Sequence, residues 1–138
     1  MKIIFLASLS FLLTGCASPT ASTVQVRDAE ISIDLARTVE EQARGLGGRS
    51  NLDDRGMLFI YASGKTPTFW MKNMLVPIDL IWINDGKVIG FEKNMTPDSG
   101  AKLYQAPGVV TEILEAPAGW LDTHGIVTGD QVVVNLRR

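Results

Sequence analysis

The sequence predicts one mainly β domain with one or two short helices. Apolar and polar residues alternate over positions 24–36, which is typical of strands with one wet face. Short apolar runs broken by turn residues fill positions 56–84, and Asp85-Gly86 after them is typical of a hairpin turn. With 138 residues, about half of them apolar, the chain can bury a real core.

The N-terminus is expected to be a targeting segment, not part of the fold. Lys2 precedes an apolar run at positions 3–13 that suits a signal peptide and is too short to span a bilayer. The run ends in Leu13-Thr14-Gly15-Cys16, which resembles the lipobox of bacterial lipoproteins, whose cysteine is acylated after cleavage. Cys16 is the only cysteine, so the chain has no internal disulfide. The alternative is a chance cysteine behind an ordinary signal peptide.

These observations predict a signal peptide at 1–15, a lipid-anchored tether and lead-in at 16–28, and a β-rich domain at 29–138. The expected partner of Cys16 is a membrane, because each buried methylene of an acyl chain contributes roughly 0.8 kcal/mol. Ala17-Ser18 lacks the Asp that resembles an inner-membrane retention signal. We therefore expect an exported lipoprotein, on the periplasmic face of the outer membrane if the cell has two membranes.

The first half of the domain is predicted to contain strands, one helix and more strands. The alternating positions 24–36 form the first strands, and Thr38 with Glu41 three residues later predicts a capping box. The short helix that follows is expected to end at Gly47-Gly48. Three short, mostly buried strands are expected within 56–84, separated by Gly64, Pro67 and Pro77.

The second half begins with a hairpin that joins positions 78–84 to 87–93. Positions 94–107 predict a long loop over one end of the sheet, and 109–116 predict another buried strand. Pro117 is expected to open a brief helix that reaches Thr123 and ends at Gly125. Positions 131–136 are expected to close the fold as a strand.

Several segments of the chain together carry a resemblance to a known family. These segments are Arg44-Gly45-Leu46, Gly56-Met57-Leu58-Phe59, Phe69-Trp70-Met71-Lys72-Asn73-Met74, Pro77-Ile78-Asp79-Leu80, Leu114-Glu115, Ala118-Gly119 and Gly129-Asp130. They resemble the DUF192 family of small, often exported prokaryotic proteins. The similarity runs from about Ala29 to Leu136 and implies a compact β-rich fold, a β-sandwich or jelly-roll-like domain with short helices, but no reaction.

Polar side chains among apolar neighbours are the candidate site residues, because an unpaired buried charge costs about several kcal/mol and needs a partner. If Asp79 and Glu115 lie close together, one carboxyl would stay protonated and the two could act as an acid and base pair. Alternatively, each carboxylate pairs with a cation or with backbone N–H groups. The predicted ligand-binding residues are Trp70, Lys72, Asn73, Asp79 and Glu115, with Arg44 and Arg49 near the rim.

The aromatic and sulfur-containing residues have simpler expected roles. Trp82 is expected in the core, whereas Trp70 and Trp120 are candidates for an aromatic platform. Met57, Met71 and Met74 are expected to fill gaps in the core. His124 is the only histidine, so we expect no metal, and nothing in the sequence predicts a cofactor.

The leading functional hypothesis is a non-enzymatic, lipid-anchored envelope module that binds a small molecule, a glycan or a protein partner. A hydrolase that uses Asp79 and Glu115 on an envelope polymer is the second hypothesis, and a structural assembly component is the third. Nucleic acid is not an expected partner, because 13 Lys and Arg are scattered among 15 Asp and Glu.

Overall fold

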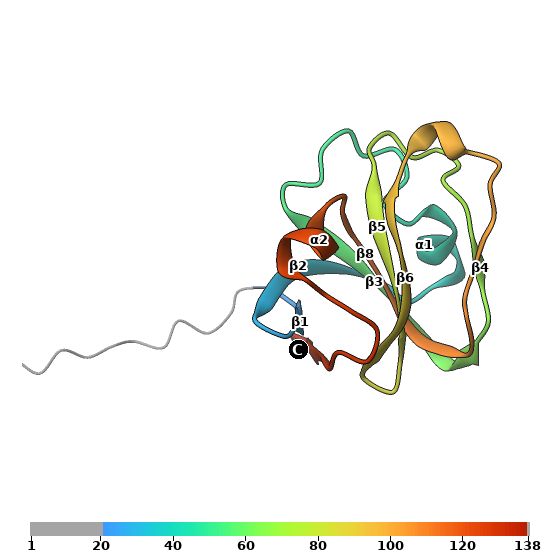
Figure 1. Cartoon of the computed structure of the whole chain (residues 1–138). Helices are drawn as coiled ribbons and strands as arrows, with labels where there is room; N and C mark the ends of the chain where they lie inside the picture. The colour runs from blue at the N-terminus through green and yellow to red at the C-terminus, as the bar shows by residue number, and fades with distance from the viewer. Residues whose placement is uncertain (1–20, 138) are drawn as a thin grey trace, which may run out of the picture.

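A computed structural model describes residues 21–137 of the chain (Figure 1). The predicted signal peptide and the predicted lipidation site, Cys16, lie outside these residues. Within residues 21–137, no helix is both long enough and apolar enough to cross a membrane.

Seven strands form one sheet in the order β6-β5-β8-β3-β2-β1-β9. All neighbours are antiparallel except β2 and β3, which run parallel and are connected through the helix α1 (Val39–Arg44). The strands are β1 (Thr23–Val26), β2 (Ala29–Ala36), β3 (Arg55–Lys65), β5 (Ile78–Asn84), β6 (Lys87–Met95), β8 (Val110–Pro117) and β9 (Val132–Asn135).

The sheet curls into a half-barrel, so the two edge strands approach each other. Lys87 forms an isolated bridge with Gln131, and the Val88 N–H donates to the Asp130 carbonyl at 3.0 Å. The expectation of a sandwich or jelly roll is therefore corrected in its detail, because one sheet folds toward itself instead of facing a second large sheet. The mainly β class with two short helices is confirmed.

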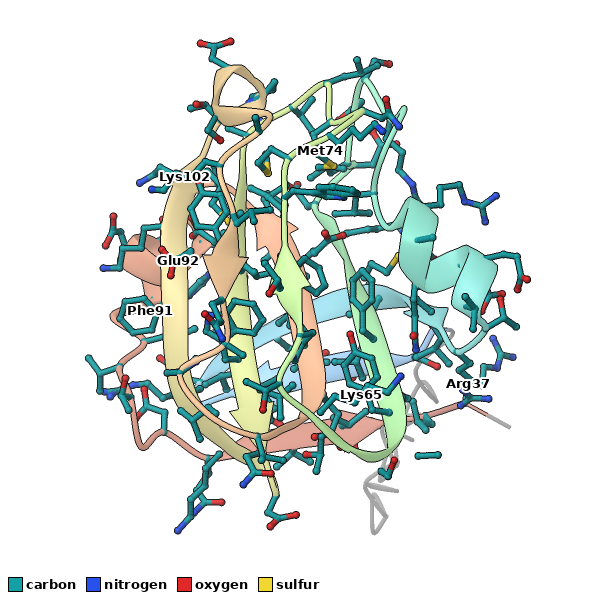
Figure 2. All side chains as sticks on the ribbon, turned by 90° about the vertical axis from the view of Figure 1, so that its right-hand side faces the viewer. Arg37, Lys65, Met74, Phe91, Glu92 and Lys102 are labelled. Atoms are coloured by element: carbon teal, nitrogen blue, oxygen red, sulfur yellow. The ribbon has the colours of Figure 1, made fainter. Side chains whose placement is uncertain are left out.

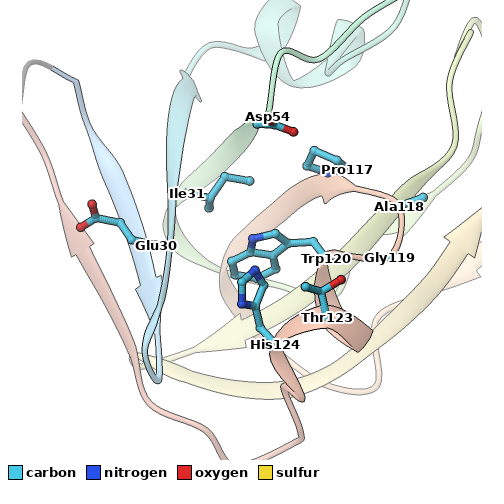
Figure 3. Close-up of a pocket in the computed structure, with 9 residues that line it drawn as sticks. All are labelled: Glu30, Ile31, Asp54, Pro117, Ala118, Gly119, Trp120, Thr123 and His124. Carbon is cyan, nitrogen blue, oxygen red and sulfur yellow. The ribbon is translucent and has the colours of Figure 1, made fainter.

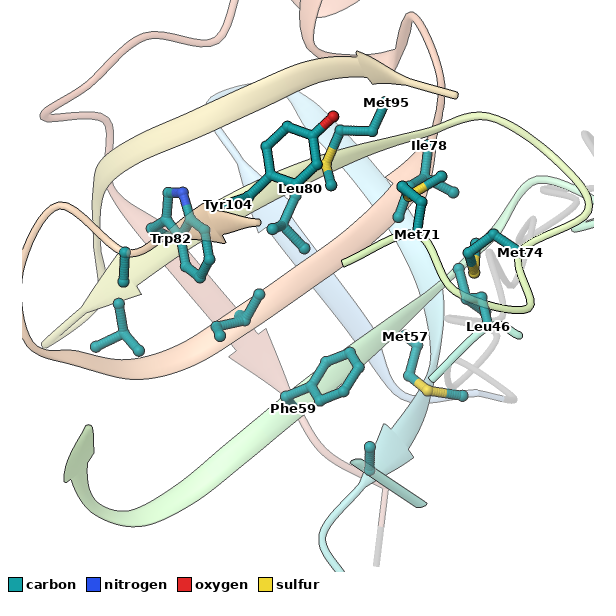
Figure 4. Packing of buried hydrophobic residues seen from close by; sticks show 14 of the residues in the cluster. Leu46, Met57, Phe59, Met71, Met74, Ile78, Leu80, Trp82, Met95 and Tyr104 are labelled. Carbon is teal, nitrogen blue, oxygen red and sulfur yellow. The ribbon is translucent and has the colours of Figure 1, made fainter. Parts of the chain in front are cut away.

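Apolar residues cover both faces of this sheet. The inner cluster draws side chains from all seven strands and from the helix α2 (Trp120–His124), whose Leu121 is fully buried. The outer cluster lies under α1 and a two-stranded ribbon made of β4 (Thr68–Phe69) and β7 (Tyr104–Gln105), and Figure 4 shows its packing. Because both faces are covered, β5 is buried from Ile78 to Ile83.

Local sequence signals set most element boundaries. The hairpin between β5 and β6 is confirmed, with positive φ at Asp85 (46°) and Gly86 (69°). The capping box is confirmed too, since the Thr38 hydroxyl accepts from the Glu41 N–H and the Glu41 carboxylate accepts from the Thr38 N–H. The three strands expected within 56–84 are β3, β4 and β5.

Three expectations about chain connections are corrected. Helix α1 ends at Arg44 with Gly45 as its C-cap, before the expected stop at Gly47-Gly48. Pro117 is the last residue of β8, so α2 begins only at Trp120, although Gly125 ends it as expected. The long loop contains a 3-10 turn, η1 (Pro97–Ser99), and β7, which pairs with β4 across a face of the sheet and not over its end.

Candidate functional site

A pocket of about 240 Å³ lies between the end of α1, the β4 segment and the outer face of β3 and β8. It brings together four of the predicted site residues, Arg44, Trp70, Lys72 and Glu115, which are widely separated in the chain. Figure 2 looks onto this side of the molecule, which carries α1 and the β4–β7 ribbon. The other lining residues are Gln42, Ala43, Gly45, Phe59, Thr68, Phe69 and Met74.

Glu115 on β8 is the buried polar group of this pocket, with 5% of its surface exposed. Its Oε2 accepts a hydrogen bond from the Leu46 N–H at 3.1 Å. No group within residues 21–137 donates a hydrogen bond to its Oε1. Every side-chain oxygen in these residues that lacks such a partner retains some exposed surface, so Oε1 is accessible from the pocket. Burial raises the pKa of Glu115 to about 7, against the opposing effects of the Leu46 N–H and the Arg49 charge.

Gly45 explains why the pocket can reach this carboxylate. Its backbone has φ +52° and ψ −139°, a conformation in which a residue with a side chain would be strained. A Cβ at this position would lie 3.1 Å from Glu115 Oε2 and 3.2 Å from Phe59 Cζ. The turn at Gly45 also directs the Leu46 N–H toward Glu115 and buries the Leu46 side chain. Gly45 and the Leu46 N–H therefore shape the floor of the pocket around Glu115.

Aromatic rings form the wall and the rim. Phe69 contacts the rings of Phe59 and Trp82 edge-on, at centroid distances of 5.2 and 5.6 Å. Trp82 is 1% exposed, which confirms its expected place in the core, whereas Trp70 is 54% exposed at the rim. The Lys72 ammonium lies 5.4 Å from the Trp70 ring centroid. The pocket is thus apolar inside and aromatic and cationic at its mouth.

The segment from Met71 to Met74 is a tight turn held down by its two methionines. Both side chains are buried, and the Met74 N–H donates to the Met71 carbonyl at 3.1 Å. Asn73 has φ 63°, and its carbonyl accepts from the Gly48 N–H at 2.8 Å. Asn73 therefore shapes the turn and does not line the pocket. Met57 is also buried, so the expected core role of all three methionines is confirmed.

Asp79 lies on the other face of the sheet. Leu80 is paired with Glu115 and Asp79 with Ala116, so Asp79 and Glu115 point in opposite directions from neighbouring strands. Asp79 is fully buried, and it accepts from the Leu121 N–H at 2.9 Å and the Asn94 N–H at 2.8 Å.

These contacts give Asp79 a structural role. Leu121 belongs to the first turn of α2, whose N-cap Gly119 has no side chain, so Asp79 caps this helix from β5. An acid and base pair made of Asp79 and Glu115 is incompatible with this geometry, because the sheet separates the two carboxylates. The expectation that they act together on one substrate bond is corrected accordingly.

Arg49 belongs to an ion-pair cluster next to the pocket. It contacts Asp34 at 2.8 Å, and Arg55 contacts the other oxygen of Asp34 at 2.6 Å. Burial alone would raise the pKa of Asp34, but the hydrogen bonds and charges of Arg55 and Arg49 hold it below its ordinary value. Arg49 does not line the pocket and acts on Glu115 through its charge.

Comparison with known proteins identifies the family. The DUF192 family, described as "Uncharacterized ACR, COG1430", matches residues 22–134. The chain belongs to the DUF192 family. No curated protein matches the chain.

Two solved structures share the fold of this DUF192 chain. A protein of unknown function from Novosphingobium aromaticivorans is 29% identical, with a TM-score of 0.76 over 91% of this chain and 99% of that one. A Sinorhizobium meliloti protein, described as "a putative transcription regulator", is 25% identical, with a TM-score of 0.78 over 87% of this chain and 98% of that one.

A second pocket of the DUF192 domain, of about 340 Å³, contains Trp120, one of the two candidates for an aromatic platform, but the rest of its lining was not predicted from the sequence (Figure 3). The rings of Trp120 and His124 lie 5.3 Å apart in its wall, and Glu30 and Asp54 lie around it. These residues come from α2, from β2 and from the turn before β3, and no local signal indicates that the turn meets α2. Within residues 21–137, no three His, Cys, Asp or Glu side chains are grouped to hold a metal ion.

Proposed function

We propose that this DUF192 protein is a non-enzymatic binding module that holds a small ligand in the pocket above Glu115. The observation that carries the proposal is the open Oε1 of a buried carboxyl at the floor of an apolar pocket. A buried polar atom that lacks a protein partner is stabilised when a ligand supplies the missing hydrogen bond. Glu115 is thus the residue that anchors the ligand.

The dimensions of the pocket favour a small ligand, or one residue of a larger chain, over a folded partner. Its volume of about 240 Å³ lies below the range of about 300–1,000 Å³ that is typical of pockets for drug-sized ligands. The exposed face of Trp70 at the rim suits stacking of a flat ring or the apolar face of a sugar. Glu115 is the only Asp or Glu among the described residues that line this pocket, which favours binding over hydrolysis.

A fragment screen by NMR tests this proposal. The purified protein is titrated with neutral, anionic and cationic fragments while the Leu46 amide and the Trp70 indole N–H signals are followed. We expect hits that shift both signals, and these hits should be weakened by Glu115→Gln but not by Glu40→Gln, the same change at an exposed position of α1. Hits that map elsewhere, or that bind Glu115→Gln as well as wild type, would contradict the proposal.

We also propose that the module is anchored to a membrane through lipidated Cys16, on the periplasmic face of the outer membrane if the cell has two. The support is the order of charge, apolar run and Leu13-Thr14-Gly15-Cys16 near the N-terminus. Cells are labelled with radioactive palmitate, and we expect label on the wild type and none on Cys16→Ala. Equal labelling of both proteins, or of neither, would refute the anchor.

A further inference from the structure

The charges of the pocket are ordered by depth. Glu115 lies at the floor with 5% of its surface exposed, whereas the Arg44 and Lys72 side chains are exposed at the mouth. Neither cation forms an ion pair inside the part of the chain that the structure describes, and Lys72 lies only against the Trp70 ring. A ligand that enters therefore meets positive charge first and negative charge last.

The walls between these charges are apolar. Phe59, Phe69 and Met74 line this part of the pocket. Phe59 and Met74 are buried, and Phe69 is fixed by its edge contacts with Phe59 and Trp82. Phe59, Phe69 and Met74 offer a polar group no hydrogen-bond partner, so the part of the ligand that lies along them is expected to be apolar.

The floor favours a cationic donor over a neutral one. A hydroxyl group would donate to Oε1 but would leave the negative charge of a buried carboxylate uncompensated. An ammonium group supplies both the hydrogen bond and the opposite charge, and such charge-assisted bonds are roughly twice as strong as neutral ones. Arg49 does not fill this role, because it already pairs with Asp34 and does not line the pocket.

Resting on the binding function proposed above, we propose that the ligand is a small zwitterion whose ammonium group binds Glu115 and whose carboxylate lies at the mouth beside Arg44 and Lys72. A short apolar chain separates the two charges and lies along Phe59, Phe69 and Met74. An α-amino acid with an uncharged side chain does not meet this requirement, because its ammonium and carboxylate groups are attached to the same carbon atom. The class is therefore an ω-amino acid, or a larger molecule that ends in one.

Proton binding at the floor gives this proposal a second signature. The ionised carboxylate is the form that attracts an ammonium group, and burial places the pKa of Glu115 at about 7. Affinity should therefore rise as the pH increases through neutrality. The bound ammonium group should in turn lower the pKa of Glu115, because binding and ionisation favour each other.

Isomeric probes separate the requirements. 6-Aminohexanoate and norleucine have the same atoms, but their charges are separated in the first and adjacent in the second. Hexylamine lacks the carboxylate, and hexanoate lacks the ammonium group. Dissociation constants are measured from the shifts of the Leu46 amide and the Trp70 indole N–H. We expect 6-aminohexanoate to bind about tenfold or more tightly than each of the other three, which is the effect of one charged hydrogen bond.

Two variants assign the effect to the floor of the pocket. Glu115→Gln should abolish the advantage of 6-aminohexanoate over hexanoate and its pH dependence, while Glu40→Gln should keep both. If norleucine, hexylamine or hexanoate binds as tightly as 6-aminohexanoate, the proposal of a ligand with two separated charges is refuted. The proposal that the pocket binds a small ligand is not affected by that result. If neither this series nor any fragment of the broader screen shifts the two signals, both proposals are refuted.

Discussion

Replacing Asp79 by Asn should destabilise the protein strongly, although it changes only one oxygen into an amide nitrogen. The Asp79 carboxylate accepts from the Leu121 and Asn94 N–H groups, and it is fully buried. Asparagine has one accepting oxygen, so one of these N–H groups would face the side-chain NH₂ and lose its bond. A hydrogen bond to a charged group contributes about 1.5–3 kcal/mol, and the unpaired donor adds a further cost.

The expected loss is about 2–4 kcal/mol of unfolding free energy, or roughly 10 °C in melting temperature for a domain of this size. Thermal unfolding followed by circular dichroism measures the total loss. Amide exchange at Leu121 shows whether α2 loosens, because Asp79 caps that helix. Asp98→Asn, the same change at an exposed position in η1, is the control and should melt within about 1 °C of wild type.

An Asp79→Asn protein that melts with the wild type or above it would refute this reasoning. That result would mean that the free-energy cost of burying the negative charge is as large as the stabilisation that the two hydrogen bonds contribute. No cation within residues 21–137 pairs with Asp79, so these N–H groups provide the compensation that the structure shows.

The remaining predictions concern the pocket. Because burial raises the pKa of Glu115 from 4.5 to about 7, the folded protein retains a proton that the unfolded chain loses between these values. The free energy of unfolding measured with urea should therefore fall by about 3 kcal/mol as the pH rises from about 4.5 to about 7, and an unchanged slope in Glu115→Gln would contradict this. Gly45→Ala should lose about 1 kcal/mol or more beyond Gly48→Ala, because both positions have positive φ but only the Cβ at Gly45 meets Glu115. Equal losses in denaturant titrations would show that the close approach is unimportant. Lys72→Met should unfold within about 0.5 kcal/mol of wild type, since Lys72 is exposed, yet should bind 6-aminohexanoate more weakly; an early melt would make Lys72 part of the scaffold.

Elements that depend on neighbouring residues were predictable from the sequence. The Asp85-Gly86 hairpin and the Thr38–Glu41 capping box need only local chemistry, and both are present. The half-barrel was not predictable in this way. Apolar residues on both faces of β5 indicate that both faces of the sheet are covered, but they do not indicate by which elements. In the structure, α2 and the curl of the sheet cover one face, and the β4–β7 ribbon covers the other.

The candidate site was predictable in its residues but not in its arrangement. Polar groups beside core residues marked both Asp79 and Glu115, and nothing local distinguishes them. Their separation depends on the pairing of Leu80 with Glu115, which places Asp79 on the opposite face. The contact between Leu46 and Glu115 spans 69 positions of the chain, so only the strand order reveals it. Asn73 looked like a ligand residue because of its neighbours, but its positive φ shows that it shapes the turn.

The pKa of the Glu115 carboxyl tests the central claim most directly. The protein is labelled with ¹³C on its glutamate side chains, the Glu115 carboxyl signal is assigned by its absence from Glu115→Gln, and its shift is followed against pH. A midpoint near pH 7, which falls when 6-aminohexanoate is added, is the predicted result. A midpoint near 4.5, like those of exposed glutamates and unaffected by the probe, would show that Glu115 is not the buried, open carboxyl on which the binding site depends.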